Sequence, residues 1–214
     1  MVDSTLDHIV VAAPTLKSGV EWVRDTLDAT PEYGGMHPRM GTHNCLLSLG
    51  GQTYLEVIAP DPNAPDPGRP RWFELDRLKR NSPPRLAAWV ARTTDIKATV
   101  AAGSEPLGVI EPMSRGELNW LITVTDDGSL PLGGIAPILI EWHTAAHPSK
   151  GMRGSDCRLL RLELQHPDVE RVGTLLQSIE LEGDLDVKPH AAASAPRLVA
   201  AFLTSRGEKT LSTA

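Results

Sequence analysis

The chain has 214 residues, 41% of them hydrophobic and 22% charged, with a formal net charge of −6. These fractions are ordinary for a globular protein and exclude an intrinsically disordered chain. The acidic balance argues against a nucleic-acid partner, and every apolar run is far shorter than the ~20 residues that a membrane-spanning helix needs. The N-terminal residues lack the pattern of a secretory signal, so we expect a soluble, cytoplasmic protein.

The first 60 residues carry the pattern of one β-α-β-β-β module. An apolar, β-branched run ends at Pro14, Thr15 can cap a helix, and Gly50-Gly51 can turn a hairpin. Gly34 and Gly35 are typical of a loop ahead of that hairpin. The elements predicted with defined bounds are strand 6–13, helix 16–27, strand 44–49 and strand 53–59.

A proline-rich connector separates this module from a second one. Residues 60–70 contain five prolines, which exclude a helix or an inner strand. A short amphipathic helix over 72–78 is expected next. The module pattern then returns, with strand 86–92, helix 95–101, strand 116–125 and strand 135–142.

The two modules can be laid over each other. Gly41–Leu46 matches Gly116–Leu121 with Gly, Asn and Leu in step, and residues 54–57 match 139–142. The second match places Glu56 and Glu141 at the same point of the repeat. A carboxylate recurring in both copies is more informative than either one alone.

The tail has the pattern of a shortened third copy. An alternating Leu run over 158–165 predicts a strand, and Pro167 stands where a helix with apolar side chains at helical spacing would begin. Two further short strands are expected near 184–188 and 197–204. We therefore divide the chain into paired modules over 1–150, spanning about 5–60 and 85–145, and a partial third module over 151–214 packed on the same domain.

A tandem β-α-β-β-β repeat, together with residues 6–12, 41–50 and 53–60, resembles the glyoxalase-like branch of the vicinal oxygen chelate (VOC) superfamily. The resemblance implies an α+β fold in which two modules form a curved, cup-like mixed sheet around one site. It also implies a divalent metal held by the first and last strands of each module. The superfamily includes lyases, epimerases, dioxygenases and metal-free binding proteins, so the fold leaves the reaction open.

Carrying the ligand positions across assigns His8, Glu56 and Glu141 as metal ligands, with Ala88 at the fourth position. Alanine binds no metal, so the missing ligand is a water, another side chain such as His43 or His143, or the sign of a metal-free cup. A mixed His and carboxylate set suits Zn, Mn, Ni or Fe. Glu56 is either a ligand or a catalytic base, and a His8–carboxylate ion pair in a metal-free cup is the alternative.

Three further residues are candidates for substrate binding: His43, Trp120 and His143. His43 qualifies if the face that it shares with Cys45 and Leu47 points inward. We interpret Asn44 and its repeat mate Asn119 as residues that fix turn geometry. His147 is expected in a surface loop.

Arg39 and Arg115 occupy equivalent loops before Gly41 and Gly116. Solvated loop arginines are the ordinary reading, and binding of an anionic substrate is the alternative.

The residues favour a metal-dependent lyase, isomerase or dioxygenase acting on a small oxygenated molecule. The alternative is a metal-free protein of the same fold that sequesters a small molecule. Ala88 favours the binding protein, whereas carboxylates at matched positions favour the enzyme. Either way we expect a small-molecule ligand and a monomer or homodimer, the monomer if the tail covers the edge of the sheet.

Overall fold

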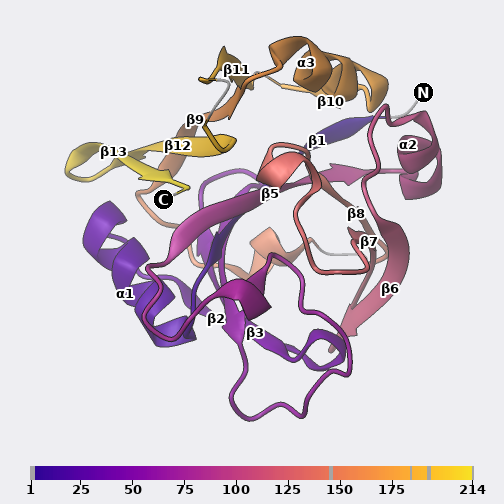
Figure 1. Cartoon of the computed structure of the whole chain (residues 1–214). Coiled ribbons are helices and arrows are strands. Elements are labelled where there is room, and N and C mark those ends of the chain that lie inside the picture. Colours follow the sequence, from indigo (N-terminus) through magenta and orange to yellow (C-terminus); the bar gives the residue numbers. More distant parts are fainter. Residues whose placement is uncertain (1–2, 145–146, 184, 192–193, 214) are drawn as a thin grey trace.

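The computed structural model describes residues 3–144, 147–183, 185–191 and 194–213. Figure 1 shows a strongly curled sheet built from the two modules, with the C-terminal unit (orange to yellow) lying across its outer side. The fold is α+β, with the predicted curved mixed sheet and, in the part of the chain that the structure describes, three α-helices. No helix within the described ranges is long and apolar enough to cross a membrane.

The first module begins with the strand, capped helix and hairpin that the sequence predicts. Thr15 caps the first helix by accepting a hydrogen bond from the Ser18 N–H at 3.1 Å. The Gly34-Gly35 pair is a correction, because it lies inside an edge strand rather than a loop. The elements are β1 (Ser4–Ala12), α1 (Leu16–Leu27), β2 (Glu32–His37), β3 (Thr42–Ser48) and β4 (Tyr54–Pro60).

The second module repeats this order after the proline-rich connector. Its helix is capped by Asp95, whose side chain accepts a hydrogen bond from the Ala98 N–H at 2.9 Å. The amphipathic helix expected in the connector is only a 3₁₀ turn over Leu75–Arg77. The elements are β5 (Arg85–Thr93), α2 (Ile96–Ala102), β6 (Val109–Arg115), β7 (Leu118–Val124) and β8 (Ile138–Trp142), and the remaining 3₁₀ turns cover Pro38–Met40, Pro131–Gly134 and Pro148–Gly151.

The two modules join through antiparallel pairing of β1 with β5 at the centre of one sheet. The strand order is β2-β3-β4-β1-β5-β8-β7-β6, so β2 and β6 are the outermost strands. The sheet curls enough for side chains from these two strands to meet, and Arg39, just after β2, pairs with Glu111 of β6 at 2.6 Å. We call the concave face of this sheet the cup.

The C-terminal unit forms a second sheet of order β11-β9-β12-β13. It begins with the predicted strand and helix but ends with a hairpin strand that the sequence analysis missed. Its strand order differs from that of the modules, because β9 lies between β11 and β12. The elements are β9 (Arg158–His166), α3 (Val169–Ser178), β10 (Leu181–Glu182), β11 (Asp186–Pro189), β12 (Arg197–Thr204) and β13 (Gly207–Ser212).

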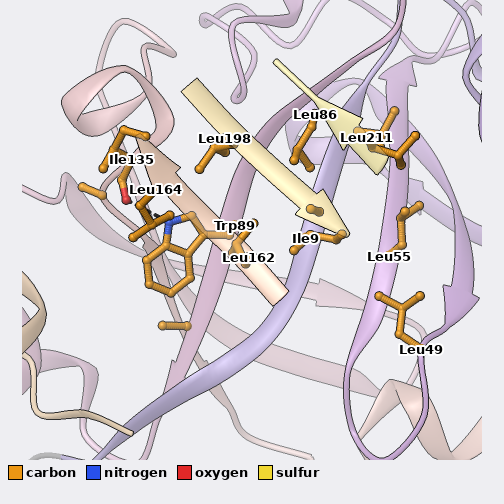
Figure 2. Packing of buried hydrophobic residues seen from close by; sticks show 14 of the residues in the cluster. Ile9, Leu49, Leu55, Leu86, Trp89, Ile135, Leu162, Leu164, Leu198 and Leu211 are labelled. Atoms are coloured by element: carbon orange, nitrogen blue, oxygen red, sulfur yellow. Dashed lines mark hydrogen bonds between the residues drawn. The ribbon is translucent and has the colours of Figure 1, made fainter. Parts of the chain in front are cut away.

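This second sheet packs on the convex face of the large sheet and leaves the edge strands β2 and β6 uncovered. Figure 2 shows Leu162, Leu164 and Leu198 against Trp89 and Ile9, all in one buried cluster. The Trp89 indole N–H donates to the Ile135 carbonyl at 2.8 Å, so the largest core side chain keeps its polar atom paired. A separate apolar cluster lines the cup itself.

Candidate functional site

The cup encloses a small cavity of about 30 Å³ between the two modules. Its polar wall comes mainly from β1, β3 and β4, and its aromatic wall comes from the connector, β7 and β8. A space of this size holds one water-sized group. The lining consists of His8, His37, Asn44, Leu46, Tyr54, Glu56, Trp72, Phe73, Arg115, Trp120, Ile122, Ile140 and Trp142.

His8 stands at the floor of the cup and is held by its neighbour Asp7. The His8 Nδ1 atom lies 2.6 Å from Asp7 Oδ1, although adjacent strand residues normally point to opposite faces. A bulge in the β1–β5 pairing between Leu6 and His8 removes that alternation. Asp7 is fully buried and also contacts His147 Nε2 at 2.9 Å and the Trp142 indole N–H at 3.1 Å.

Glu56 of β4 faces His8 across the cup floor. The His8 Nε2 atom and Glu56 Oε2 are 3.6 Å apart, which is beyond the usual hydrogen-bond range. The other Glu56 oxygen accepts a hydrogen bond from the Asn44 amide at 2.5 Å. Tyr54 stacks on His8 with ring centroids 4.5 Å apart, which fixes the plane of the imidazole.

Arg115 enters the cup from the end of β6. Its Nη1 donates to Asn44 Oδ1 at 3.0 Å and lies 3.4 Å from His37 Nε2. The Arg115 side chain packs directly on Gly35 of β2, where a Cβ atom would lie 2.6 Å from Arg115 Cδ. The two glycines of the edge strand therefore leave room for the side chains that converge on Glu56.

Burial and charge set the protonation states of the cup. Burial alone would lower the pKa of His8, but its interactions with Asp7 and Glu56 outweigh this and raise that pKa to about 9. Burial opposes ionisation of Glu56, but His8 and the Asn44 amide lower its pKa to about 2. At neutral pH the floor therefore holds an imidazolium between two carboxylates.

His37 and Tyr54 stay neutral in the same surroundings. Burial lowers the pKa of His37 to about 4, so its ring can accept from Arg115. Burial and the nearby carboxylates of Asp7 and Glu56 raise the pKa of Tyr54 above its ordinary value.

The structure brings His8 and Glu56 together but places Glu141 elsewhere. Ile138 and Ile140 of β8 belong to the cup cluster, so the alternating Glu141 points to the outer face. There its carboxylate accepts a hydrogen bond from the Ile96 N–H at the start of α2, at 2.8 Å. The expectation that Glu141 shares the cup with the other two residues is wrong.

Of the three substrate-binding candidates, the structure places one in the cup and two outside it. Trp120 lines the cavity, and its role there stays a prediction. His43 lies on the outer face with Cys45 and Leu47, because their strand turns Asn44 and Leu46 inward. His143 is 45% exposed and pairs with Glu141 at 2.6 Å, outside the cup.

Strand register explains why the repeat overlay misplaced the second carboxylate. Val10, two residues after His8, pairs with Glu56, whereas Val90, two residues after Ala88, pairs with Ile138. Ile138 therefore occupies the position that Glu56 has in the first module. The overlay on Glu141 was three residues out of register, and any odd shift moves a side chain to the opposite face.

The cup therefore offers an incomplete donor set for a divalent metal. Of the four positions that the resemblance implies, with Ile138 in place of Glu141, His8 and Glu56 carry ligand atoms, whereas Ala88 and Ile138 are apolar and buried. Across the described residues, no group of three or more His, Cys, Asp or Glu side chains is arranged to hold a metal ion. These residues do not fit the metal site that the family resemblance implies.

Sequence reasoning missed several residues of the site. Asn44 bonds Glu56 rather than a turn. Arg115 ends β6 instead of lying in a loop, and its side chain reaches into the cup. His147 is mostly buried against Asp7. Asn44 is next to Cys45 in a predicted strand, so their side chains point to opposite faces of the sheet. That alternation was the sequence signal for the direction of Asn44. Nothing in the sequence indicates the bulge that turns Asp7 toward His8.

The curled sheet of paired modules and the polar cup define a VOC-fold protein. The sequence profile of the family described as "Glyoxalase-like domain" matches residues 6–180, so the chain belongs to that family. The comparison with curated proteins found no match.

Solved structures with the same fold resemble the chain at low sequence identity. A hypothetical protein from Staphylococcus aureus is 13% identical with a TM-score of 0.57, and the match covers 97% of this chain and 84% of that one. Methylmalonyl-CoA epimerase from Mycobacterium tuberculosis is 18% identical with a TM-score of 0.42, over 66% of this chain and 88% of that one. At 13% identity the likeness to the Staphylococcus aureus protein shows the fold alone.

Proposed function

We propose that the chain is a metal-independent proton-transfer enzyme, of isomerase or lyase type, acting on a small carbonyl compound. The observation that carries the proposal is the arrangement of His8. Asp7 holds its Nδ1 atom at 2.6 Å, while its Nε2 atom faces Glu56 across 3.6 Å. An imidazolium N–H that is fixed in direction but not closed onto Glu56 can donate to a substrate oxygen.

In the proposed reaction, the Glu56 carboxylate takes a proton from the carbon next to the substrate carbonyl. The electrons of the broken C–H bond move to the carbonyl oxygen and form an enolate. The His8 imidazolium stabilises that negative charge, and Arg115 adds a second cation near it. Returning the proton to either face gives isomerisation, and loss of a leaving group from the neighbouring carbon gives elimination.

The cup supports this chemistry because its charged side chains are buried and preorganised. Asp7, His8 and Glu56 are all almost completely buried. Buried charges are costly to keep, so a cup used only for apolar ligands would be more stable without them. Trp72 and Phe73, which follow the connector, line the cavity with aromatic surface.

The test is solvent hydrogen exchange. Pyruvate and hydroxyacetone are incubated with the protein in D₂O, and loss of the C–H signal is followed by proton NMR. We expect exchange above the buffer rate that falls about 100-fold or more in Glu56→Gln, which keeps the side-chain shape but removes the base. Equal exchange by the parent and Glu56→Gln would overturn the proposal.

A metal-free binding protein is the second candidate, and one observation favours it. Asn44 and His8 satisfy Glu56 so well that its pKa lies near 2, which makes it a weak base until a ligand separates it from His8. Tight binding of a carbonyl compound with no exchange at its neighbouring carbon would select this function over the enzyme.

A further inference from the structure

A groove of about 490 Å³ adjoins the cup on its β2 side, far larger than the inner cavity of about 30 Å³. Leu46 and Arg115 line both spaces, so these two side chains form the wall between them. A volume of several hundred cubic ångströms is typical of sites for small organic ligands. The inner cavity holds only the reactive end of any such molecule.

We propose that this groove binds the tail of an elongated organic anion, whose charged group is held by Arg115 and whose reactive end enters the cup. The inference rests on the proposed function only in placing the reactive end in the cup. Its ligand class is an extended carboxylate or phosphate ester with a largely aliphatic tail.

The first support for an anionic ligand is the charge of Arg115. The guanidinium bonds the neutral side chains of Asn44 and His37, and no carboxylate of the described residues lies within ion-pair distance of it. A partly buried arginine without a carboxylate partner, placed where two cavities meet, suits an anionic ligand.

The second support for a binding site is the way in which two parts of the chain build the walls of the groove. The C-terminal unit and the first module face each other across it, and hydrogen bonds tie them on both sides. The Ser155 hydroxyl donates to the Ser48 carbonyl at 2.6 Å, and the Ser205 hydroxyl contacts Asp28 at 3.2 Å. The groove is therefore a built feature, and it gives the C-terminal unit a part in ligand binding.

The groove wall provides the apolar contact for a tail. Leu27, Tyr33, Leu118 and Met152 contribute carbon surface beyond Arg115, and Asp156 adds a carboxylate. Two further carboxylates of the lining, Asp28 and Glu32, are paired with Arg206 and Arg153. Tyr33 is 63% exposed, so its ring is accessible to a ligand in the groove.

A second opening beside the cup is less suited to an anion. It has a volume of about 260 Å³ and is lined by His37, Arg39 and Trp120 among others. Its arginine already has a carboxylate partner, because Arg39 binds Glu111 at 2.6 Å and shares it with Arg69 at 2.7 Å. Arg115 has no such partner among the described residues, which favours the groove over this opening.

The experiment measures binding, which does not depend on proton transfer. Butanoate, hexanoate and octanoate are titrated into the full chain by isothermal calorimetry, with octan-1-ol as the uncharged control and octyl phosphate as the alternative anion. Each methylene buried in the groove should tighten binding about fourfold. Octanol should bind at least tenfold more weakly than octanoate, and the order of octanoate and octyl phosphate decides between carboxylate and phosphate.

Two variants localise the binding. Gly154→Trp fills the groove at a position where a Cβ atom meets nothing within 4 Å, so the fold should tolerate it. Gly173→Trp on α3 is the matched control, since its Cβ is equally free but lies outside the groove. We expect the affinity of Gly154→Trp to be independent of the length of the alkyl chain. The affinity of Gly173→Trp should rise with chain length as it does in the parent.

Arg115→Met should weaken every anion at least tenfold while leaving octanol unchanged, with Arg80→Met as the control at another arginine. Binding that is independent of chain length, or unaffected by Gly154→Trp, would overturn the groove proposal. Binding as expected without hydrogen exchange would uphold the groove and reject the enzyme. Hydrogen exchange together with binding that does not depend on chain length would uphold the enzyme and reject the groove.

Discussion

The two modules share one fold but differ in what they turn into the cup. The first module presents His8 and Glu56 and supports them with Asp7 and Asn44. The corresponding positions of the second module are Ala88 and Ile138, and apart from Arg115 its wall is aliphatic and aromatic. The duplicated scaffold thus carries the buried His and carboxylate side chains in one half, while the other half supplies a largely apolar wall and one arginine.

This contrast explains why the donor set for a metal is incomplete. A metal at the centre of a two-module cup needs ligands from both halves, and here only one half provides them. The first module instead satisfies its charges internally, through an imidazolium between two carboxylates. Substitutions can therefore either break this internal pairing or add metal ligands to the second module.

Removing Asp7 should have the largest effect on stability. Asp7→Ala leaves His8 and His147 without their buried carboxylate, and breaking such a pair costs about 3–5 kcal/mol. Urea unfolding measures the change in the free energy of unfolding. Asp25→Ala, at an exposed ion pair, is the control and should cost less than about 1 kcal/mol. A loss of under 1 kcal/mol in Asp7→Ala would mean that the cup floor is not held as described.

Restoring the second half should create a metal site. Ala88→His combined with Ile138→Glu adds ligands at the positions that correspond to His8 and Glu56. We expect this double variant to bind Zn²⁺ at least 100-fold more tightly than the parent, measured by titration against a chromogenic chelator. Equal affinity of parent and variant would show that the register assignment is wrong or that the parent is already a metal protein.

Stability should fall at alkaline pH because His8 loses its proton. Its pKa is about 9 in the folded chain and 6.5 in the reference state, so the stabilisation is complete below pH 6.5 and disappears as pH rises through 9. A shift of this size corresponds to about 3–4 kcal/mol, or roughly 7–14 °C in melting temperature. Thermal unfolding between pH 6.5 and 9.5 should show this slope in the parent, and His8→Gln should flatten it. An identical slope in both proteins would contradict the assignment.

Changing Glu141 should have the smallest effect. Glu141→Ala removes the carboxylate that accepts the Ile96 N–H at the start of α2, which costs about 1 kcal/mol. Because the side chain lies outside the cup, hydrogen exchange on pyruvate should stay within twofold of the parent. Loss of exchange equal to that of Glu56→Gln would place Glu141 in the site after all.

The fold could be predicted because periodicity and turn chemistry are local. The Thr15 cap, the strands carrying His8 and Glu56, and the repeat itself all follow from neighbouring residues. The face of Glu141 could not be predicted in the same way. Because both modules carry a glutamate in the last strand, the sequence alignment matched Glu141 with Glu56. The pairing of Val90 with Ile138 shows that Ile138, not Glu141, corresponds to Glu56.

The site was harder to predict because its key contacts depend on irregularity and distance. The bulge at Asp7 breaks the alternation on which face assignments rest. Arg115 meets Asn44 from 71 residues away, through the curl of the sheet and the space left by Gly35. Bulges and long-range curl leave little trace in a single sequence.

The most direct test of a metal-independent cup is hydrogen exchange on pyruvate in D₂O, before and after exhaustive treatment with EDTA. We predict that the exchange rate is unchanged by the chelator and is lost in Glu56→Gln. Exchange that EDTA abolishes and a divalent metal restores would contradict the account, because it would require a metal site that Ala88 and Ile138 do not provide.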